Sequence, residues 1–302
     1  MNCLWRCPLK PHVIRKAGLP SYCSTLIELF AEKRDGEPTH IGEGTGFFYR
    51  IGKVVFLVTN WHVVTGRHPE KPGELLPGYP ISPTHIQLHI PEDTNRNHFR
   101  PGELIPLYDE GRPIWLETPA KNDVDIVLLP LRFPDTAITP AVQDFAPYAG
   151  RILVPGVDVT IIGFPFGRNK TNPFPIWKKA MIASEPAYTI DGKAYTFLDT
   201  PGRPGMSGSP VYALSNGFEA TAEEKDALSS AGSPLERIDI LSKIGDRFNK
   251  PVPVLEFVGV YSGSYGDQSL DRLNLGRFWP AGLLGGYEDK LISGQNPYPP
   301  FE

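Results

Sequence analysis

A serine flanked by glycines stands in the segment Gly205-Met206-Ser207-Gly208-Ser209-Pro210. A histidine follows an apolar run in Thr59-Asn60-Trp61-His62, and an acid opens another apolar run in Asp125-Ile126-Val127-Leu128. A serine hydroxyl is a poor nucleophile at neutral pH unless an imidazole removes its proton and a carboxylate holds that imidazole in the required tautomer. The chain therefore carries the three groups of a nucleophilic serine site, in the order histidine, acid, serine.

This order discriminates between folds. In α/β-hydrolases the serine comes first, in a Gly-x-Ser-x-Gly turn between a strand and a helix, and the histidine comes last. Here no histidine follows His98, so an imidazole that serves Ser207 comes from the N-terminal third and meets the serine across an interface. The order also excludes the subtilisin arrangement and matches the chymotrypsin one.

The composition is that of a globular protein with many turns. The chain has 302 residues, 40% of them hydrophobic, which is enough for one large core or two smaller ones. Its 30 glycines and 33 prolines, without a low-complexity tract, favour short strands joined by turns. The net charge of −4 attracts neither nucleic acid nor an anionic membrane, and no apolar run approaches the ~18 residues of a membrane-spanning helix. We therefore expect no nucleic-acid or membrane partner.

Three cysteines, Cys3, Cys7 and Cys23, all stand near the N-terminus. They allow at most one disulfide, and their spacing with His12 matches no common zinc site. The N-terminal segment also lacks the uninterrupted apolar core of a signal peptide. We therefore expect a reduced, cytoplasmic protein without a metal or another cofactor.

Apolar and alternating runs predict two β-modules. The predicted strands are 24–30, 42–51, 54–59, 85–90, 114–116 and 126–131 in the first module, and 157–163, 179–184, 194–198, 211–212 and 254–262 in the second. Prolines and glycines predict a long surface loop over 66–83, and alternation within 85–90 places His85 and His89 on a solvated face. Apolar residues at helical intervals predict a partly helical insertion at about 215–251.

Four motifs together resemble those of the trypsin-like serine peptidase superfamily, and most closely its disulfide-free HtrA/Deg-like and bacterial or viral members. The segments 59–64 and 125–128 resemble Thr-Asn-x-His-Val-Val and Asp-Ile-Ala-Leu, while 162–167 and 205–210 resemble Ile-Gly-x-Pro-Phe-Gly and Gly-x-Ser-Gly-x-Pro. The resemblance covers roughly residues 23–270 and leaves no room for a PDZ-like domain after the last predicted strand. It implies an all-β fold of two six-stranded antiparallel β-barrels, the chymotrypsin-like double barrel, with a partly helical insertion.

This fold implies a division of the chain into four parts. Residues 1–22 are an irregular leader, and 23–140 form an N-terminal barrel that carries His62 and Asp125. Residues 141–281 form a C-terminal barrel that carries Ser207 and contains the insertion, and 282–302 are a tail rich in glycine and proline.

The resemblance also implies a role for each residue of the motifs. Ser207 is the nucleophile, His62 the general base and then the general acid, and Asp125 the carboxylate that orients His62. The backbone N–H groups of Gly205 and Ser207 form the oxyanion hole. Asp123 is the rival for the acid, and the family register, with the acid directly before the apolar run, favours Asp125.

Substrate binding is expected at Pro201 and at Ser262, Gly263 and Ser264. Pro201 holds the position, six residues before the nucleophile, where enzymes that cleave after lysine or arginine carry an acid; we therefore expect preference for a small or medium apolar residue. Ser262 is expected to form a hydrogen bond with the triad acid. Met206 replaces the acid with which zymogens capture a new N-terminus, so packing or a regulatory event must order the oxyanion loop.

These expectations describe a serine endopeptidase that hydrolyses peptide bonds of protein or peptide substrates through an acyl-enzyme intermediate. The alternative is a catalytically silent or partner-activated trypsin-like module that binds peptides. The intact His, Asp and Ser argue against a silent module, because peptide binding alone needs none of them. A regulatory partner is expected at the 215–251 insertion.

Overall fold

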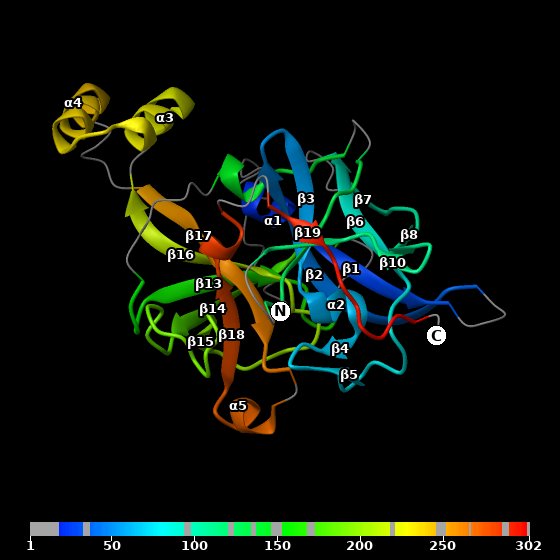
Figure 1. Cartoon of the computed structure of the whole chain (residues 1–302). Coiled ribbons are helices and arrows are strands. Elements are labelled where there is room, and N and C mark those ends of the chain that lie inside the picture. Colours follow the sequence, from blue (N-terminus) through cyan, green and yellow to red (C-terminus); the bar gives the residue numbers. More distant parts are fainter. Residues whose placement is uncertain are drawn as a thin grey trace, which may run out of the picture.

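The computed structural model describes residues 18–32, 37–93, 98–119, 124–133, 137–145, 153–167, 173–217, 221–245, 252–265, 267–285 and 290–300. Strands dominate these residues and form two units that lie side by side, the first in blue to cyan and the second in green to orange (Figure 1). The fold is all-β and of the chymotrypsin-like double-barrel type, as the motifs predict. None of the described helices is long and apolar enough to cross a membrane.

The first unit is a curled antiparallel sheet. Its strands are β1 (Ser24–Ala31), β2 (Thr39–Ile51), β3 (Val54–Thr59), β6 (His85–Asp93), β7 (His98–Pro101), β8 (Ile105–Pro106), β11 (Leu116–Glu117), β12 (Val127–Leu129) and β19 (Ile292–Ser293). The order is β19-β11-β12-β3-β2-β1-β6-β7, with β8 beside β6. In the described residues the path of hydrogen bonds stays open between β7 and β19, which are short strands, so this unit curls without closing.

The second unit is a closed barrel with the strand order β13-β14-β15-β18-β17-β16. Its strands are β13 (Asp158–Gly163), β14 (Ile176–Ile182), β15 (Thr196–Asp199), β16 (Pro210–Gly217), β17 (Val252–Gly263) and β18 (Leu275–Pro280). The sequence prediction missed β18, because Arg277 interrupts its apolar pattern. This arginine is nevertheless buried, and its guanidinium stacks on the rings of Tyr195 and Tyr265 at 5.2 and 4.5 Å.

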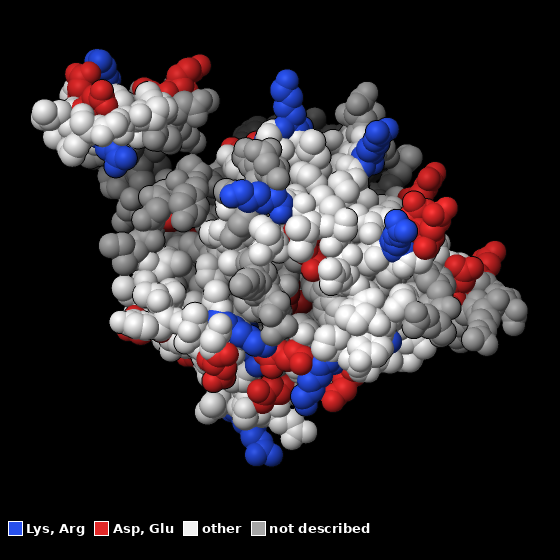
Figure 2. All heavy atoms as spheres, viewed as in Figure 1, with Lys and Arg blue, Asp and Glu red and all other residues white. Residues whose placement is uncertain are grey.

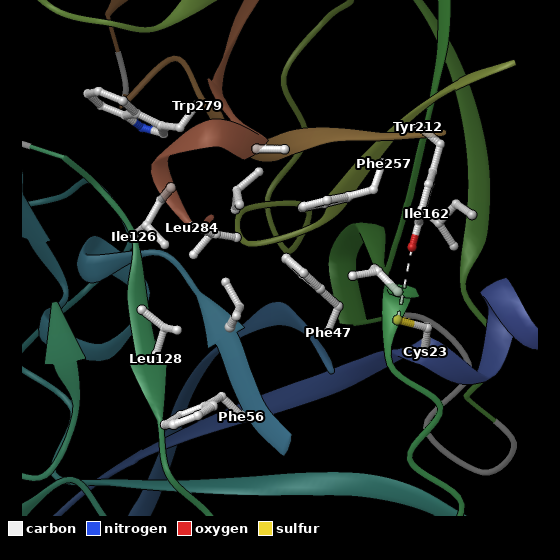
Figure 3. Packing of buried hydrophobic residues seen from close by; sticks show 14 of the residues in the cluster. Cys23, Phe47, Phe56, Ile126, Leu128, Ile162, Tyr212, Phe257, Trp279 and Leu284 are labelled. Carbon is white, nitrogen blue, oxygen red and sulfur yellow. Dashed lines mark hydrogen bonds between the residues drawn. The ribbon is translucent and has the colours of Figure 1, made fainter. Parts of the chain in front are cut away.

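One hydrophobic cluster joins the two units (Figure 3). Phe47 of β2 packs against Phe257 of β17, with ring centroids 5.3 Å apart, and the hydroxyl of Tyr212 contacts the sulfur of Cys23. Burial raises the pKa of Cys23 to about 12, so this thiol stays protonated and is an unreactive part of the core. The two units therefore meet through a packed interior, which fixes the groups on either side of their boundary.

Part of the expected irregular leader is helical, and the tail packs on the first unit. Residues 1–17 of the expected irregular leader lie outside the described residues, but Leu19–Cys23 forms helix α1, where Tyr22 is buried against Phe99 and Phe174. The tail returns to the first unit: β19 pairs with β11, and the Gln295 carbonyl accepts a hydrogen bond of 2.9 Å from Trp61 Nε1. The tail therefore contacts the segment that carries His62.

Two predictions for the first unit are wrong. Within 66–83, β4 (Arg67–His68) and β5 (Lys71–Leu75) form a hairpin, and the buried Leu76 follows it. His89 is buried rather than solvated, because Glu28 of the neighbouring β1 supplies a carboxylate oxygen 2.6 Å from its Nε2. Alternation along one strand could not reveal this partner on another.

Two helices, α3 (Ala222–Ser230) and α4 (Pro234–Ile244), project from the end of the β16–β17 hairpin (Figure 1). Each begins at a capping residue, Thr221 or Ser233, whose hydroxyl accepts a hydrogen bond from the N–H three residues later. Leu235 and Ile238 of α4 are 78% and 61% exposed. Charged side chains of both signs cover the projection, and neither sign dominates the face in view (Figure 2).

Candidate active site

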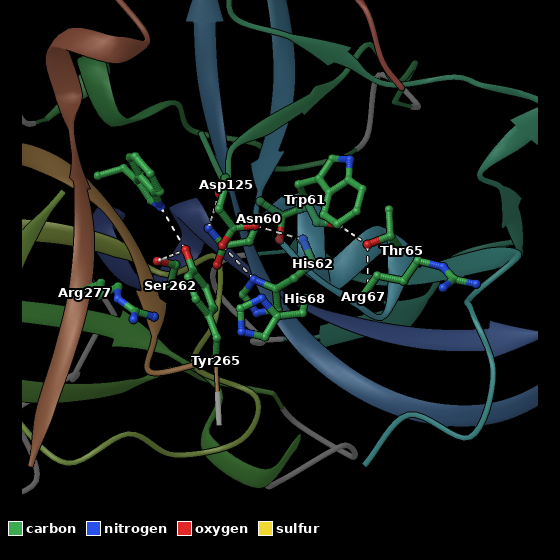
Figure 4. Close-up of polar contacts among 12 residues, drawn as sticks. Asn60, Trp61, His62, Thr65, Arg67, His68, Asp125, Ser262, Tyr265 and Arg277 are labelled. Carbon is green, nitrogen blue, oxygen red and sulfur yellow. Dashed lines mark hydrogen bonds and ion pairs between the residues drawn. The ribbon is translucent and has the colours of Figure 1, made fainter. Parts of the chain in front are cut away.

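The end of β3 places His62 beside Asp125. Helix α2 (Trp61–Thr65) follows β3 directly, and Asp125 stands just before β12, which pairs with β3 in the register Val127 to Thr59. His62 Nδ1 lies 2.7 Å from Asp125 Oδ2, and the backbone N–H of His62 donates to Asp125 Oδ1 at 2.9 Å. Figure 4 shows the two side chains facing each other. Both residues are buried, Asp125 completely. The rival acid, Asp123, lies outside the described residues.

This contact determines the tautomer of the imidazole. An ionised carboxylate only accepts hydrogen bonds, so the proton of a neutral His62 resides on Nδ1 and leaves the lone pair on Nε2. Asn60 helps to hold Asp125 in place, because its side-chain amide donates a hydrogen bond of 2.6 Å to the backbone carbonyl of Asp125. His62 thus presents a proton acceptor away from Asp125.

Ser207 and His62 line one cleft between the two units. The cleft has a volume of about 430 Å³, and the second unit contributes Gly205 and Ser207 to its wall while the first contributes His62 and Glu43. The structure therefore brings the predicted nucleophile and base to the same cavity, with Asp125 buried behind the base.

Two backbone N–H groups of the loop that ends at Ser207 have no partner among the described residues. The Pro204 carbonyl accepts a hydrogen bond of 2.8 Å from the N–H of Phe166. Because the peptide bond is trans, the N–H of Gly205 points to the opposite side from that carbonyl. Among the hydrogen bonds of the described residues, neither the Gly205 N–H nor the Ser207 N–H has an acceptor. The two groups are therefore available to an oxygen in the cleft.

Packing orders this loop. Met206 is buried in the core of the second unit, where its side chain joins the cluster of Val211 and Tyr261. Gly205 and Gly208 have φ of 86° and 84°, and a Cβ at either position would collide with backbone oxygen, that of Phe164 or of Thr45. The glycines of the motif are thus required by both conformation and space.

Thr45 connects the loop to the first unit, and the sequence prediction missed it. Its hydroxyl donates to the Gly205 carbonyl at 2.7 Å and accepts from the Phe164 N–H at 3.0 Å. Its own N–H donates to the Ser207 carbonyl at 2.9 Å. A threonine in a glycine-rich strand carries no local signal for this role, because all three partners come from the other unit.

We expect Thr45→Val to loosen the loop, because valine keeps the shape of threonine but leaves the buried Gly205 carbonyl and Phe164 N–H without their partner. The free energy of unfolding should fall by about 1–3 kcal/mol for each group. Reaction of Ser207 with a fluorophosphonate should slow by about 10-fold or more, since small displacements of reacting groups are costly. Denaturant titration and labelling rates measure the two effects. Thr39→Val, an exposed position on the same strand, is the control; equal behaviour of the two variants would contradict the assignment.

The residues predicted to bind substrate all line the cleft: Pro201, Ser262, Gly263 and Ser264. One predicted contact is wrong, because the Ser262 hydroxyl accepts a hydrogen bond of 3.0 Å from Tyr265 Oη, and no bond from Ser262 to Asp125 occurs among the described contacts. The ring of Tyr265 lies against that of His62, and the sequence prediction did not single out this tyrosine.

Charged side chains lie near Pro201, the uncharged residue predicted at the bottom of the specificity pocket. Asp271 and Arg203 line the cleft with opposite charges, and Asp271 Oδ1 accepts from the Ser264 hydroxyl at 2.6 Å. Lys178 donates to the Pro201 carbonyl and to the Thr200 hydroxyl, and burial, together with the nearby charge of Arg203, lowers its pKa to about 8. Among the described residues, the cleft wall thus carries one basic side chain, Arg203, and two acidic ones, Asp271 and Glu43.

Comparison with known proteins identifies the family of this chain. The sequence profile of the trypsin-like peptidase domain matches residues 44–218, more than half of the chain, and includes His62, Asp125 and Ser207. The chain belongs to the trypsin-like peptidase family. A search of curated proteins found no significant match for this trypsin-like peptidase. Among solved structures it is similar to an inactive serine-to-alanine mutant of Rv3671c from M. tuberculosis H37Rv, with 15% identity, a TM-score of 0.41, and coverage of 89% of this chain and 85% of that one.

Proposed function

We propose that the protein is a serine endopeptidase that hydrolyses peptide bonds through an acyl-enzyme intermediate. The observation that carries this proposal is the His62–Asp125 pair, which leaves Nε2 of His62 as a proton acceptor in the cleft that Ser207 also lines. Family membership supports the reaction class, and the pair supports an active member of the family.

In the proposed reaction, Ser207 Oγ attacks the carbonyl carbon of the substrate while His62 Nε2 takes the hydroxyl proton. His62 then gives this proton to the amine nitrogen as the C–N bond breaks, which leaves an ester on Ser207. Water, deprotonated by His62, attacks the ester carbonyl and forms the C–O bond of the acid. The C–Oγ bond of the ester then breaks, and His62 returns the proton to Ser207 Oγ as the acid product leaves. Asp125 stabilises the imidazolium in each half-reaction without taking the proton.

The N–H groups of Gly205 and Ser207 supply the oxyanion hole in this proposal. Negative charge develops on the substrate oxygen in each tetrahedral intermediate, and a preorganised donor contributes about 3 kcal/mol to its stabilisation. The bond from Phe166 to the Pro204 carbonyl supports a loop that is ordered before substrate arrives. Such a loop favours the active enzyme over the silent module, because a silent module does not need free donors.

Substrate recognition is proposed at the end of β17 and at the loop before Gly205. One wall of the pocket is formed by Ser262, Gly263 and Ser264. The bottom of the pocket is formed by Pro201, which carries no charge. Because Pro201 carries no charge at this position, we retain the proposal that a small or medium apolar residue is preferred. A regulatory partner at the 215–251 insertion stays a prediction, which the exposed Leu235 and Ile238 make testable.

The proposed function is tested by incubating the purified protein with a peptide library and identifying the new termini by mass spectrometry. We expect cleavage with enrichment of alanine, valine or leucine before the cut bond, and no cleavage by Ser207→Ala prepared in parallel. Absence of cleavage by the folded wild-type protein would contradict the proposal. Equal cleavage by both preparations would reveal a contaminating protease.

A further inference from the structure

Tyr265 lies directly against the imidazole of His62. It follows the end of β17, and its ring meets that of His62 edge to face, with centroids 5.4 Å apart and an interplanar angle of 72°. Figure 4 shows the ring between Arg277 on one side and His62 and His68 on the other. Tyr265 is buried, so this contact belongs to the interior of the site rather than to its entrance.

Several contacts hold Tyr265 in this place. Its hydroxyl donates to Ser262 Oγ at 3.0 Å and accepts from Trp279 Nε1 at 3.3 Å. The Arg277 guanidinium lies 4.5 Å from the ring centroid, and its Nη1 donates to the Ser264 carbonyl at 3.2 Å. These bonds fix a backbone with φ of 56°, which is unusual for a residue with a side chain. A strained conformation persists only where its surroundings over-determine it.

The hydroxyl of Tyr265 keeps its proton. Burial raises the pKa of Tyr265 well above its usual value, and the negative charge of Asp125 raises it further. The protonated hydroxyl donates a hydrogen bond to Ser262. Ser262 is the residue that the family resemblance predicts to form a hydrogen bond with Asp125. Among the described contacts, the Asp125 carboxylate accepts two hydrogen bonds, both from His62, and Asp125 is completely buried.

We propose that Tyr265 is a positioning residue for His62: its ring closes the His62–Asp125 pair against water and blocks rotation of the imidazole away from Asp125. The expected effect of Tyr265 on the reaction rate rests on the proposed function. Its expected effect on the hydrogen bond between His62 Nδ1 and Asp125 Oδ2 does not. Rotation of His62 would break that bond, and the ring of Tyr265 occupies space that a rotating imidazole would need. Packing against Arg277 holds the ring, as do the hydrogen bonds of its hydroxyl, and the ring acts on His62.

Two substitutions separate the ring from its hydroxyl. Tyr265→Phe keeps the ring and removes the bonds to Ser262 and Trp279, whereas Tyr265→Leu removes the ring. Tyr188→Leu is the matched control, because Tyr188 is 72% exposed and is not among the residues that line the cleft. All three are compared with wild type by thermal unfolding, so that reactivity is measured only on folded protein.

The first readout is the proton on His62 Nδ1, observed by NMR after ¹⁵N labelling of histidine. A hydrogen bond to a buried carboxylate shifts this proton to low field, and exclusion of water keeps its signal sharp near neutral pH. We expect the signal in wild type, Tyr265→Phe and Tyr188→Leu, and its loss through exchange in Tyr265→Leu. A wild-type protein without the signal near neutral pH would overturn the proposal even if Tyr265→Leu fails to fold.

The second readout is the rate of fluorophosphonate labelling. We expect Tyr265→Leu to lower the maximal rate by about 10- to 100-fold with little change in probe affinity, and Tyr265→Phe to stay within about threefold of wild type. Equal rates and equal NMR signals in Tyr265→Leu and wild type would overturn the proposal. A wild-type protein that shows the NMR signal but does not label would refute the proposed function and leave the role of Tyr265 standing.

Discussion

Ser207→Ala is expected to lower kcat/KM for a cleaved peptide on the order of 10⁶-fold, the loss that removal of the nucleophile causes in serine peptidases. The alanine has no oxygen to form the acyl-enzyme, so His62 loses its proton donor. The N–H groups of residues 205 and 207 remain, and such groups with substrate binding leave a residual acceleration of about 10³- to 10⁴-fold over water. Steady-state kinetics on the best peptide from the library measures the effect.

The control for this variant is Ser293→Ala, an exposed serine in β19. Both variants should unfold at the wild-type temperature, because Ser207 makes no side-chain hydrogen bond within the described residues. A Ser207→Ala enzyme that retains more than a tenth of wild-type activity would contradict its role as nucleophile.

Asp125→Asn is expected to lower kcat/KM by about 10⁴-fold, because the amide imposes the wrong tautomer on His62. The His62 backbone N–H needs an acceptor, and Oδ1 provides it at 2.9 Å. The asparagine oxygen therefore takes the place of Oδ1, and the asparagine NH₂ group faces Nδ1 of His62. Because the NH₂ group only donates hydrogen bonds, Nδ1 must accept one and cannot carry the proton. The proton of His62 then moves to Nε2, which can no longer accept the proton of Ser207.

The geometry around residue 125 should survive this substitution, since asparagine and aspartate have the same shape. The Nδ1–H signal of His62 should vanish, while the unfolding temperature stays close to that of the control Asp109→Asn, an exposed position in β9 (Tyr108–Asp109). Near-normal activity of Asp125→Asn would exclude Asp125 as the orienting carboxylate and return attention to Asp123.

The sequence predicts the parts of the site whose signal is local. The Thr-Asn-x-His and Gly-x-Ser-Gly segments determine short backbone conformations by themselves: Gly205 and Gly208 adopt positive φ, and α2 starts directly after β3. The order of the motifs then implies two units that meet at a cleft. His62, Asp125 and Ser207 could be named for this reason without a structure.

The contacts that depend on other strands could not be predicted. Thr45 bonds to residues more than a hundred positions away, and His89 is buried because Glu28 pairs with it from β1. β18 was missed because a buried arginine looks polar in sequence, although aromatic rings cover it. Ser262 bonds to Tyr265 rather than to Asp125, and Tyr265, which has a positive φ, places its ring against that of His62.

The most direct test of the central claim is mass spectrometry of the protein after reaction with a fluorophosphonate. We predict one adduct, on the peptide that contains Ser207, which is absent from His62→Ala and formed at least about 10³-fold more slowly in Asp125→Asn. An adduct on another residue, or no adduct on the folded wild-type protein, would contradict an assembled serine nucleophile and its base.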